Sequence, residues 1–127
     1  MKTATTVLQM IVRITGLIQI VLGPFIWNGT TDNLIPFHIF AGSVLVLALW
    51  SLAAIAARAR VSIGLVVLAV VWGLILPILG LTQAGLVPGS AHWVIQIVHL
   101  LLGLGAIGQA ESLAMRIKRT SMLAPQA

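Results

Sequence analysis

The sequence predicts an all-α membrane protein, an antiparallel bundle of four transmembrane helices built from two related helical hairpins. Three observations lead to this fold class. Of the 127 residues, 60% are hydrophobic and only 7% are charged, whereas an average soluble domain is about 25% charged. The apolar residues gather in four runs, each reaching the roughly 20 residues that carry a helix across a bilayer. Parts of the first two runs recur in the last two.

Short links join the four expected spans. Turn-forming residues fill positions 28–33, and a basic pair, Arg58 and Arg60, marks the second link. Pro88 in a glycine-flanked segment predicts a helix stop, with Ser90 as the N-cap of the fourth helix. Because links this short return the chain directly, successive helices should be antiparallel neighbours. The spans are residues 6–27, 34–57, 61–84 and 90–117.

The positive charges predict the orientation of the chain. With four crossings, six basic residues fall on one side, while the two other links hold no Lys or Arg and contain Asp32. By the positive-inside rule we expect both termini on the cytoplasmic side of a bacterial cytoplasmic membrane. Trp27 and Trp93 are then expected at the outer interface. The six basic residues are Lys2, Arg58, Arg60, Arg116, Lys118 and Arg119.

Composition also excludes several function classes. The chain has no cysteine, so a disulfide framework, a thiolate metal site and thiol catalysis are excluded. The net charge of +5 comes from basic residues scattered among apolar runs. Since these residues make no basic stripe, we expect no nucleic-acid partner. The lipid bilayer is the expected surrounding.

The chain repeats itself with a period of two helices. The pattern Gly-Leu-Ile followed by Leu-Gly occurs at residues 16–23 and again at 73–80, an offset of 57 residues. An even number of spans per repeat predicts parallel repeats related by an axis along the membrane normal. We therefore expect one domain, residues 1–127, with repeats at about 6–57 and 61–117 and a short cytoplasmic tail at 118–127.

A histidine motif repeats in the same way. His38-x-x-x-Gly42 in the second span corresponds to His99-x-x-x-Gly103 in the fourth, at an offset of 61 residues. The four additional residues amount to about one helical turn. The fourth helix should therefore start one turn further out, which leaves both histidines at equivalent depth. Because an ionisable residue in a span is costly without a partner, both are candidates for a functional site.

Bis-histidine ligation of one haem iron is the favoured interpretation of this histidine pair. An axis between the repeats would place one imidazole on each side of a central slot. Gly42 and Gly103 lie one turn from the histidines, and a glycine there removes the side chain that would strike a porphyrin plane. Gly23 and Gly80 have no side chains, so they would leave additional room on the helices that face the histidines. His92 is a candidate contact for a haem propionate.

Two alternatives remain for the histidines. Each could hydrogen-bond across helices, with the glycines serving only close packing. A metal ion other than haem iron could also bind. However, a zinc or non-haem iron site normally requires three protein ligands, often including a carboxylate. The expected outer half offers only His92 and Asp32 as additional donors.

Arg13 and Glu111 form a separate pair of ionisable residues. Both should lie inside the cytoplasmic half, so a pair between the first and fourth helices would satisfy both charges. The alternative is a proton route or a quinone contact. The small residues from Gly103 to Ala114 predict close helix packing, within the bundle or against a partner.

Residues 19–23 (QIVLG), a short loop, and residues 35–38 (IPFH) before a Leu/Val-rich helix form one hairpin. This hairpin resembles the haem A synthase family, and residues 79–100 resemble it more loosely. Members have eight spans in two related four-helix bundles, with histidine pairs that hold haem. The resemblance thus implies a half-length relative and carries the haem-ligand role to His38 and His99. The family's cysteine pair and its acidic catalytic residue have no counterpart here, so synthase activity is not implied.

We therefore expect a small membrane b-type cytochrome with one haem b per chain, acting in electron transfer with a quinone or a redox partner protein. The alternative is a haem-free accessory or structural subunit of a larger membrane complex or homo-oligomer. An enzyme acting on haem or a quinone is the third hypothesis. No separate catalytic group is evident in the sequence.

Overall fold

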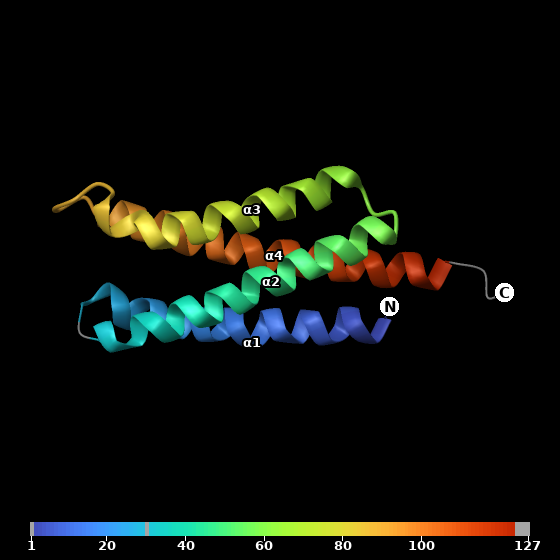
Figure 1. Ribbon diagram of the computed structural model, residues 1–127, viewed down its shortest axis with the longest axis horizontal. Helices are drawn as coiled ribbons and strands as arrows, with labels where there is room; N and C mark the ends of the chain where they lie inside the picture. Colours follow the sequence, from blue (N-terminus) through green and yellow to red (C-terminus); the bar gives the residue numbers. More distant parts are fainter. Residues whose placement is uncertain (1, 30, 124–127) are drawn as a thin grey trace.

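Four long helices make up the computed structural model, which describes residues 2–29 and 31–123. They run antiparallel along one long axis (Figure 1), and the described residues contain no strand. The four-helix, all-α fold predicted from the sequence is confirmed. The helices are α1 (Lys2–Trp27), α2 (Ile35–Arg58), α3 (Ile63–Thr82) and α4 (Trp93–Leu123), with two short 3-10 helices, η1 (Asp32–Leu34) and η2 (Gln83–Gly85).

All four helices are long and apolar enough to cross a membrane, as an integral membrane protein requires. Mean hydropathy over the spanning window is highest in α3, at 2.6, and still reaches 1.6 in α4. The start of α1, the link between α2 and α3, and the last turns of α4 share one end of the bundle (Figure 1). We refer to this as the basic end, and to the end with the other two connections as the loop end.

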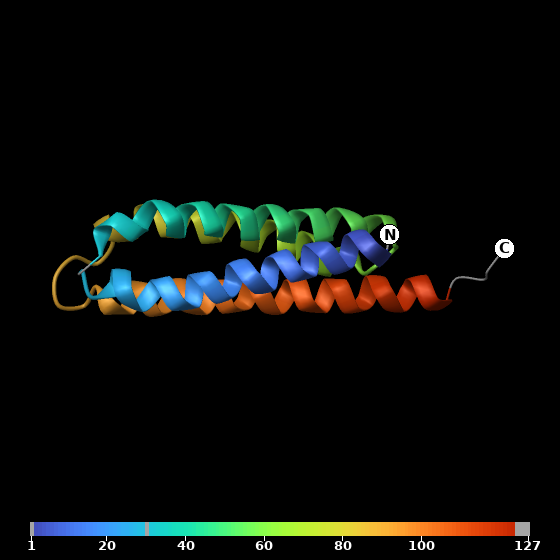
Figure 2. The same ribbon diagram turned by 90° about the horizontal axis from the view of Figure 1, so that it is seen from below.

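Helix α2 is the most enclosed element. Of its spanning window, 44% is buried, against 17% in α1 and α3 and 11% in α4. It contacts each of the other three helices, while α1 lies along α4 and α3 lies beside α2 and α4 (Figure 2). A helix that is apolar on all sides suits this central position. The outward faces of the other helices remain available to lipid.

The buried core extends from the basic end past the middle of the bundle. Toward the loop end, the last buried residue is Gly16 in α1, Ala41 in α2, Leu76 in α3 and Ala106 in α4. Beyond these positions no described residue is buried. We refer to the part beyond these positions as the loop-end half, although it is shorter than the packed half nearest the basic end.

Two tryptophans join neighbouring helices in the packed half. The indole N–H of Trp50 donates to a backbone carbonyl of α3 at 3.2 Å, and that of Trp72 to one of α4 at 2.8 Å. A Cβ on Gly73 would strike the Trp50 ring, and one on Gly105 would come within 2.7 Å of the Trp72 ring. Each indole thus requires a glycine on the next helix.

The fourth helix begins later than predicted. It starts at Trp93 rather than after an N-cap at Ser90, because a turn comes first, in which the backbone N–H of His92 donates to the carbonyl of Gly89 at 3.1 Å. Gly89 has φ +89°, a conformation that glycine adopts readily. The N-cap prediction at Ser90 was therefore wrong.

The same helix also ends later than predicted. Residues 118–123, expected in the tail, are the last turns of α4. Ile117 is fully buried and Lys118 bonds to α1, so contacts with the bundle support these turns. The rest of the expected tail, residues 124–127, lies outside the described residues.

Candidate functional site

Two histidines, one from each hairpin, meet inside the loop-end half. His38 is the fourth residue of α2, whereas His99 is the seventh of α4. Their ring centroids lie 6.2 Å apart, and the ring planes are inclined by 46°. The later position of His99 in its helix brings both rings to one depth. The equivalent depth predicted from the one-turn insertion is confirmed.

Both imidazole rings are half-buried and have an unpartnered nitrogen. The Nδ1 atom of each is buried, and no described residue forms a hydrogen bond with it. A buried polar group left without a partner costs about 1–3 kcal/mol. The predicted alternative, cross-helix hydrogen bonds from the two histidines, is therefore not supported at these atoms.

Gln19 of α1 joins the histidine pair. Its Nε2 donates to the backbone carbonyl of His38 at 2.7 Å, and its Oε1 is buried without a hydrogen-bond partner. Gly42 makes room for this amide, since a Cβ there would lie 2.6 Å from Nε2 of Gln19. Gly42 was expected to clear space for a porphyrin, but in the structure it clears space for Gln19.

The other three predicted glycines differ in their surroundings. A Cβ on Gly80 would come within 2.9 Å of Cε1 of His99, so the backbone of α3 lies directly against that imidazole. Around Gly23 and Gly103 a Cβ would meet nothing within 4 Å. Gly80 therefore limits where the His99 ring can sit, whereas Gly23 and Gly103 border open space.

His92 lies in the turn before α4. Its Nδ1 is 3.1 Å from the backbone carbonyl of Leu86, so this histidine supports the connection between η2 and α4. Its contact with a haem propionate stays a prediction.

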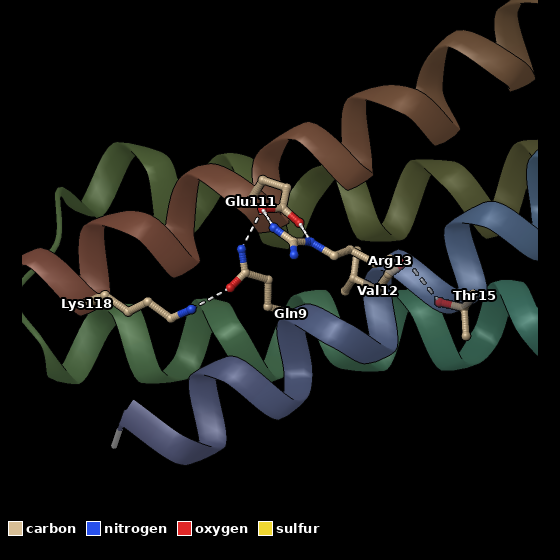
Figure 3. A network of polar contacts seen from close by, with 6 residues as sticks. All are labelled: Gln9, Val12, Arg13, Thr15, Glu111 and Lys118. Atoms are coloured by element: carbon tan, nitrogen blue, oxygen red, sulfur yellow. Dashed lines mark hydrogen bonds and ion pairs between the residues drawn. The ribbon is translucent and has the colours of Figure 1, made fainter.

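A polar network joins α1 to α4 in the packed half (Figure 3). The Arg13 guanidinium binds both carboxylate oxygens of Glu111, at 2.6 and 2.9 Å. Gln9 donates to the same carboxylate, and its Oε1 accepts from Lys118 Nζ at 2.6 Å. The predicted ion pair is confirmed. Gln9 and Lys118 were missed, although Gln9 lies one turn from Arg13 on the same helix.

The small residues of α4 lie in two different surroundings, the buried core and a surface groove. Ala106, Ala110 and Ala114 are fully buried, which confirms close packing within the bundle. On another side of α4, a groove of about 340 Å³ lies between α3 and α4, and its lining includes Gly105, Gly108 and Gln109. The Oε1 atom of Gln109 is buried and has no hydrogen-bond partner.

Within the described part of the chain, no three or more His, Cys, Asp or Glu residues form a group that could hold a metal ion. The histidine pair is thus a donor set of two. No protein-family model, curated protein or solved structure matches this chain. The resemblance to the haem A synthase family therefore rests on the hairpin motifs alone.

Proposed function

We propose that this chain is a membrane b-type cytochrome in which His38 and His99 ligate one haem iron from opposite sides. The observation that carries the proposal is the meeting of these rings, from separate hairpins, at a centroid distance of 6.2 Å. Two imidazoles that ligate one metal ion from opposite sides, at metal–nitrogen distances of about 2 Å, have centroids about 6 Å apart. The spacing therefore fits a shared metal ion.

The donor set favours haem over a bare metal ion. A porphyrin supplies the equatorial nitrogens, so two axial imidazoles complete the coordination of its iron. A zinc site needs three or four protein ligands. The described residues place no carboxylate or third histidine with the pair.

Haem, when bound, supplies a one-electron couple, and the chain supplies ligands, orientation and a low-dielectric surrounding. His38 and His99 would hold the iron. Gln19 anchors the backbone at His38, and Gly80 lets the backbone of α3 support the His99 ring. A quinone or a redox protein would exchange electrons with the site.

The absorption spectrum of the purified full chain tests this function. Expressed with an adequate haem supply, it should show the bands of six-coordinate, low-spin haem, and the pyridine haemochrome should give about one haem b per chain. His38→Ala and His99→Ala should each lose the low-spin spectrum. His92→Ala is the matched control and should keep it, since this ring contacts the η2–α4 connection. Full low-spin haem in both alanine variants would contradict the assignment.

The proposal also includes an orientation. The basic end would face the cytoplasm of a bacterial cell, as the positive-inside rule requires, and the histidine pair would then lie nearer the outer surface. Because the chain has no cysteine, single cysteines at Thr31 and Ala59 give unique labels. An impermeant thiol reagent should label Thr31→Cys in intact cells. Labelling of Ala59→Cys in intact cells instead would show the opposite orientation and contradict this part of the proposal.

A haem-free accessory subunit is the second candidate function. The observation in its favour is the groove between α3 and α4, where Gln109 has an unpartnered amide oxygen. A helix of a larger membrane complex could pack there and donate a hydrogen bond. A purified chain without any Soret band, despite an adequate haem supply, would favour this function over the first.

A further inference from the structure

A second pocket opens at the basic end, between the first turns of α1 and the last turns of α4. It has a volume of about 340 Å³ and is lined by Lys2, Thr6, Lys118 and Met122. Two primary amines therefore border one small space. A hydroxyl and an apolar side chain complete its lining.

Among the described residues, no acidic side chain forms an ion pair with either of these amines. The chain contains only two acidic residues. Asp32 lies in η1 at the loop end, and Glu111 already binds Arg13 through both of its oxygens. Arg116 and Arg119 add further positive charge to the same stretch of α4. Glu111 interacts with Lys118 at longer range and so compensates this charge only in part, and the pocket keeps a net positive charge that an anion can bind.

Lys118 is held at this pocket by the polar network. Its ammonium group donates one hydrogen bond to Oε1 of Gln9, which is only 6% exposed and donates in turn to Glu111 (Figure 3). An ammonium group has three donors, so two remain for a ligand. Because the network fixes one of the amines in advance, less conformational entropy is lost on binding.

We propose that this pocket binds the phosphate of an anionic phospholipid. The pocket lies where membrane-spanning helices end, which is the level of lipid headgroups. A phosphodiester offers oxygens to both lysines, while the acyl chains can follow the apolar outer faces of α1 and α4. A zwitterionic headgroup carries its own ammonium group, so the two lysines favour a lipid with net negative charge. The site is separate from the histidine pair and does not depend on haem.

Native mass spectrometry of the full chain in detergent tests the proposal, with phosphatidylglycerol and phosphatidylcholine as probes. One phosphatidylglycerol should be retained in preference to phosphatidylcholine. Lys2→Gln and Lys118→Gln should each weaken this binding about fivefold, the effect of one basic residue near a lipid surface. Arg60→Gln removes the same charge at the same end but outside the pocket, and should leave the affinity within about twofold.

Three results would overturn the proposal. An equal loss in Arg60→Gln would show a general surface charge effect. Displacement of the lipid by millimolar inorganic phosphate would show a free-anion site. An unchanged affinity in Lys2→Gln would show that the pocket is not involved. Lys2 takes no part in the network that joins α1 to α4, so this variant decides the question even if Lys118→Gln disturbs the fold.

Discussion

The two halves of this bundle are built from the same four helices but are packed differently. Every described residue that is buried lies in the basic-end half, which also contains the network that joins α1 to α4. The loop-end half has no buried residue among those described, although it holds three buried side-chain atoms without hydrogen-bond partners, Gln19 Oε1, His38 Nδ1 and His99 Nδ1. The candidate site therefore lies in the less densely packed half.

The side chains explain this difference. In lipid, helices associate through van der Waals packing and hydrogen bonds rather than through a hydrophobic force between them. Ala106, Ala110 and Ala114 bring α4 close to its neighbours in the basic-end half. In the loop-end half, α4 carries Gln96 and His99 instead. Closing the helices around these polar groups without partners would be costly.

Haem binding should change the loop-end half most. If His38 and His99 bind haem, free haem at about a thousandfold above its Kd should raise the free energy of unfolding by about 4 kcal/mol. Amide exchange followed by mass spectrometry should show new protection in residues 35–42 and 93–105, which carry the two proposed ligands. His99→Ala serves as the control and should show neither effect. New protection confined to the basic-end half would contradict the proposed site.

Removing a buried leucine should distinguish the halves in haem-free protein. Leu49 is fully buried, so Leu49→Ala should lower the free energy of unfolding by about 2–4 kcal/mol through lost contacts and a cavity. Leu79 is only half-buried in the loop-end half, and Leu79→Ala should cost less than about 1 kcal/mol. Reversible unfolding in mixed detergent micelles measures both. Equal losses would show that the loop-end half is packed as well as the other.

Breaking the ion pair should cost about as much as removing Leu49. Arg13 is 54% exposed and Glu111 26% exposed on helices that span the membrane, so a charge left without its partner would face lipid rather than water. Arg13→Leu and Glu111→Leu should each reduce stability, and the double variant should lose less than the sum of the two. Arg116→Leu is the control, because the Arg116 guanidinium donates only a long hydrogen bond of 3.4 Å, to Ser112. Additive losses would show that the pair contributes no coupling energy.

One substitution should have opposite effects in the two halves. Gly23→Ala and Gly103→Ala meet open space, so the better helix propensity of alanine should stabilise haem-free protein by up to about 1 kcal/mol. Gly73→Ala and Gly105→Ala would strike the Trp50 and Trp72 rings and should destabilise it. The same unfolding assay compares all four variants. Destabilisation by Gly23→Ala would mean that its surroundings are filled.

Several features could be predicted from the sequence because they depend on local properties. Length and apolarity of each run decide whether it can span a bilayer, and both are visible in the sequence. The pairing of Arg13 with Glu111 followed from the few charges inside the spans. The depth of His38 and His99 followed from counting residues along two helices. Ser90 failed as an N-cap because the turn at Gly89 precedes the helix.

Only the tertiary structure decided which half of the bundle is densely packed. It placed Gln19 against Gly42, linked Gln9 to Glu111 and Lys118, and formed a pocket between Lys2 and Lys118. These contacts join side chains up to about a hundred residues apart in the chain. They depend on the rotation and separation of whole helices, and the spacing of residues along any one helix does not contain that information.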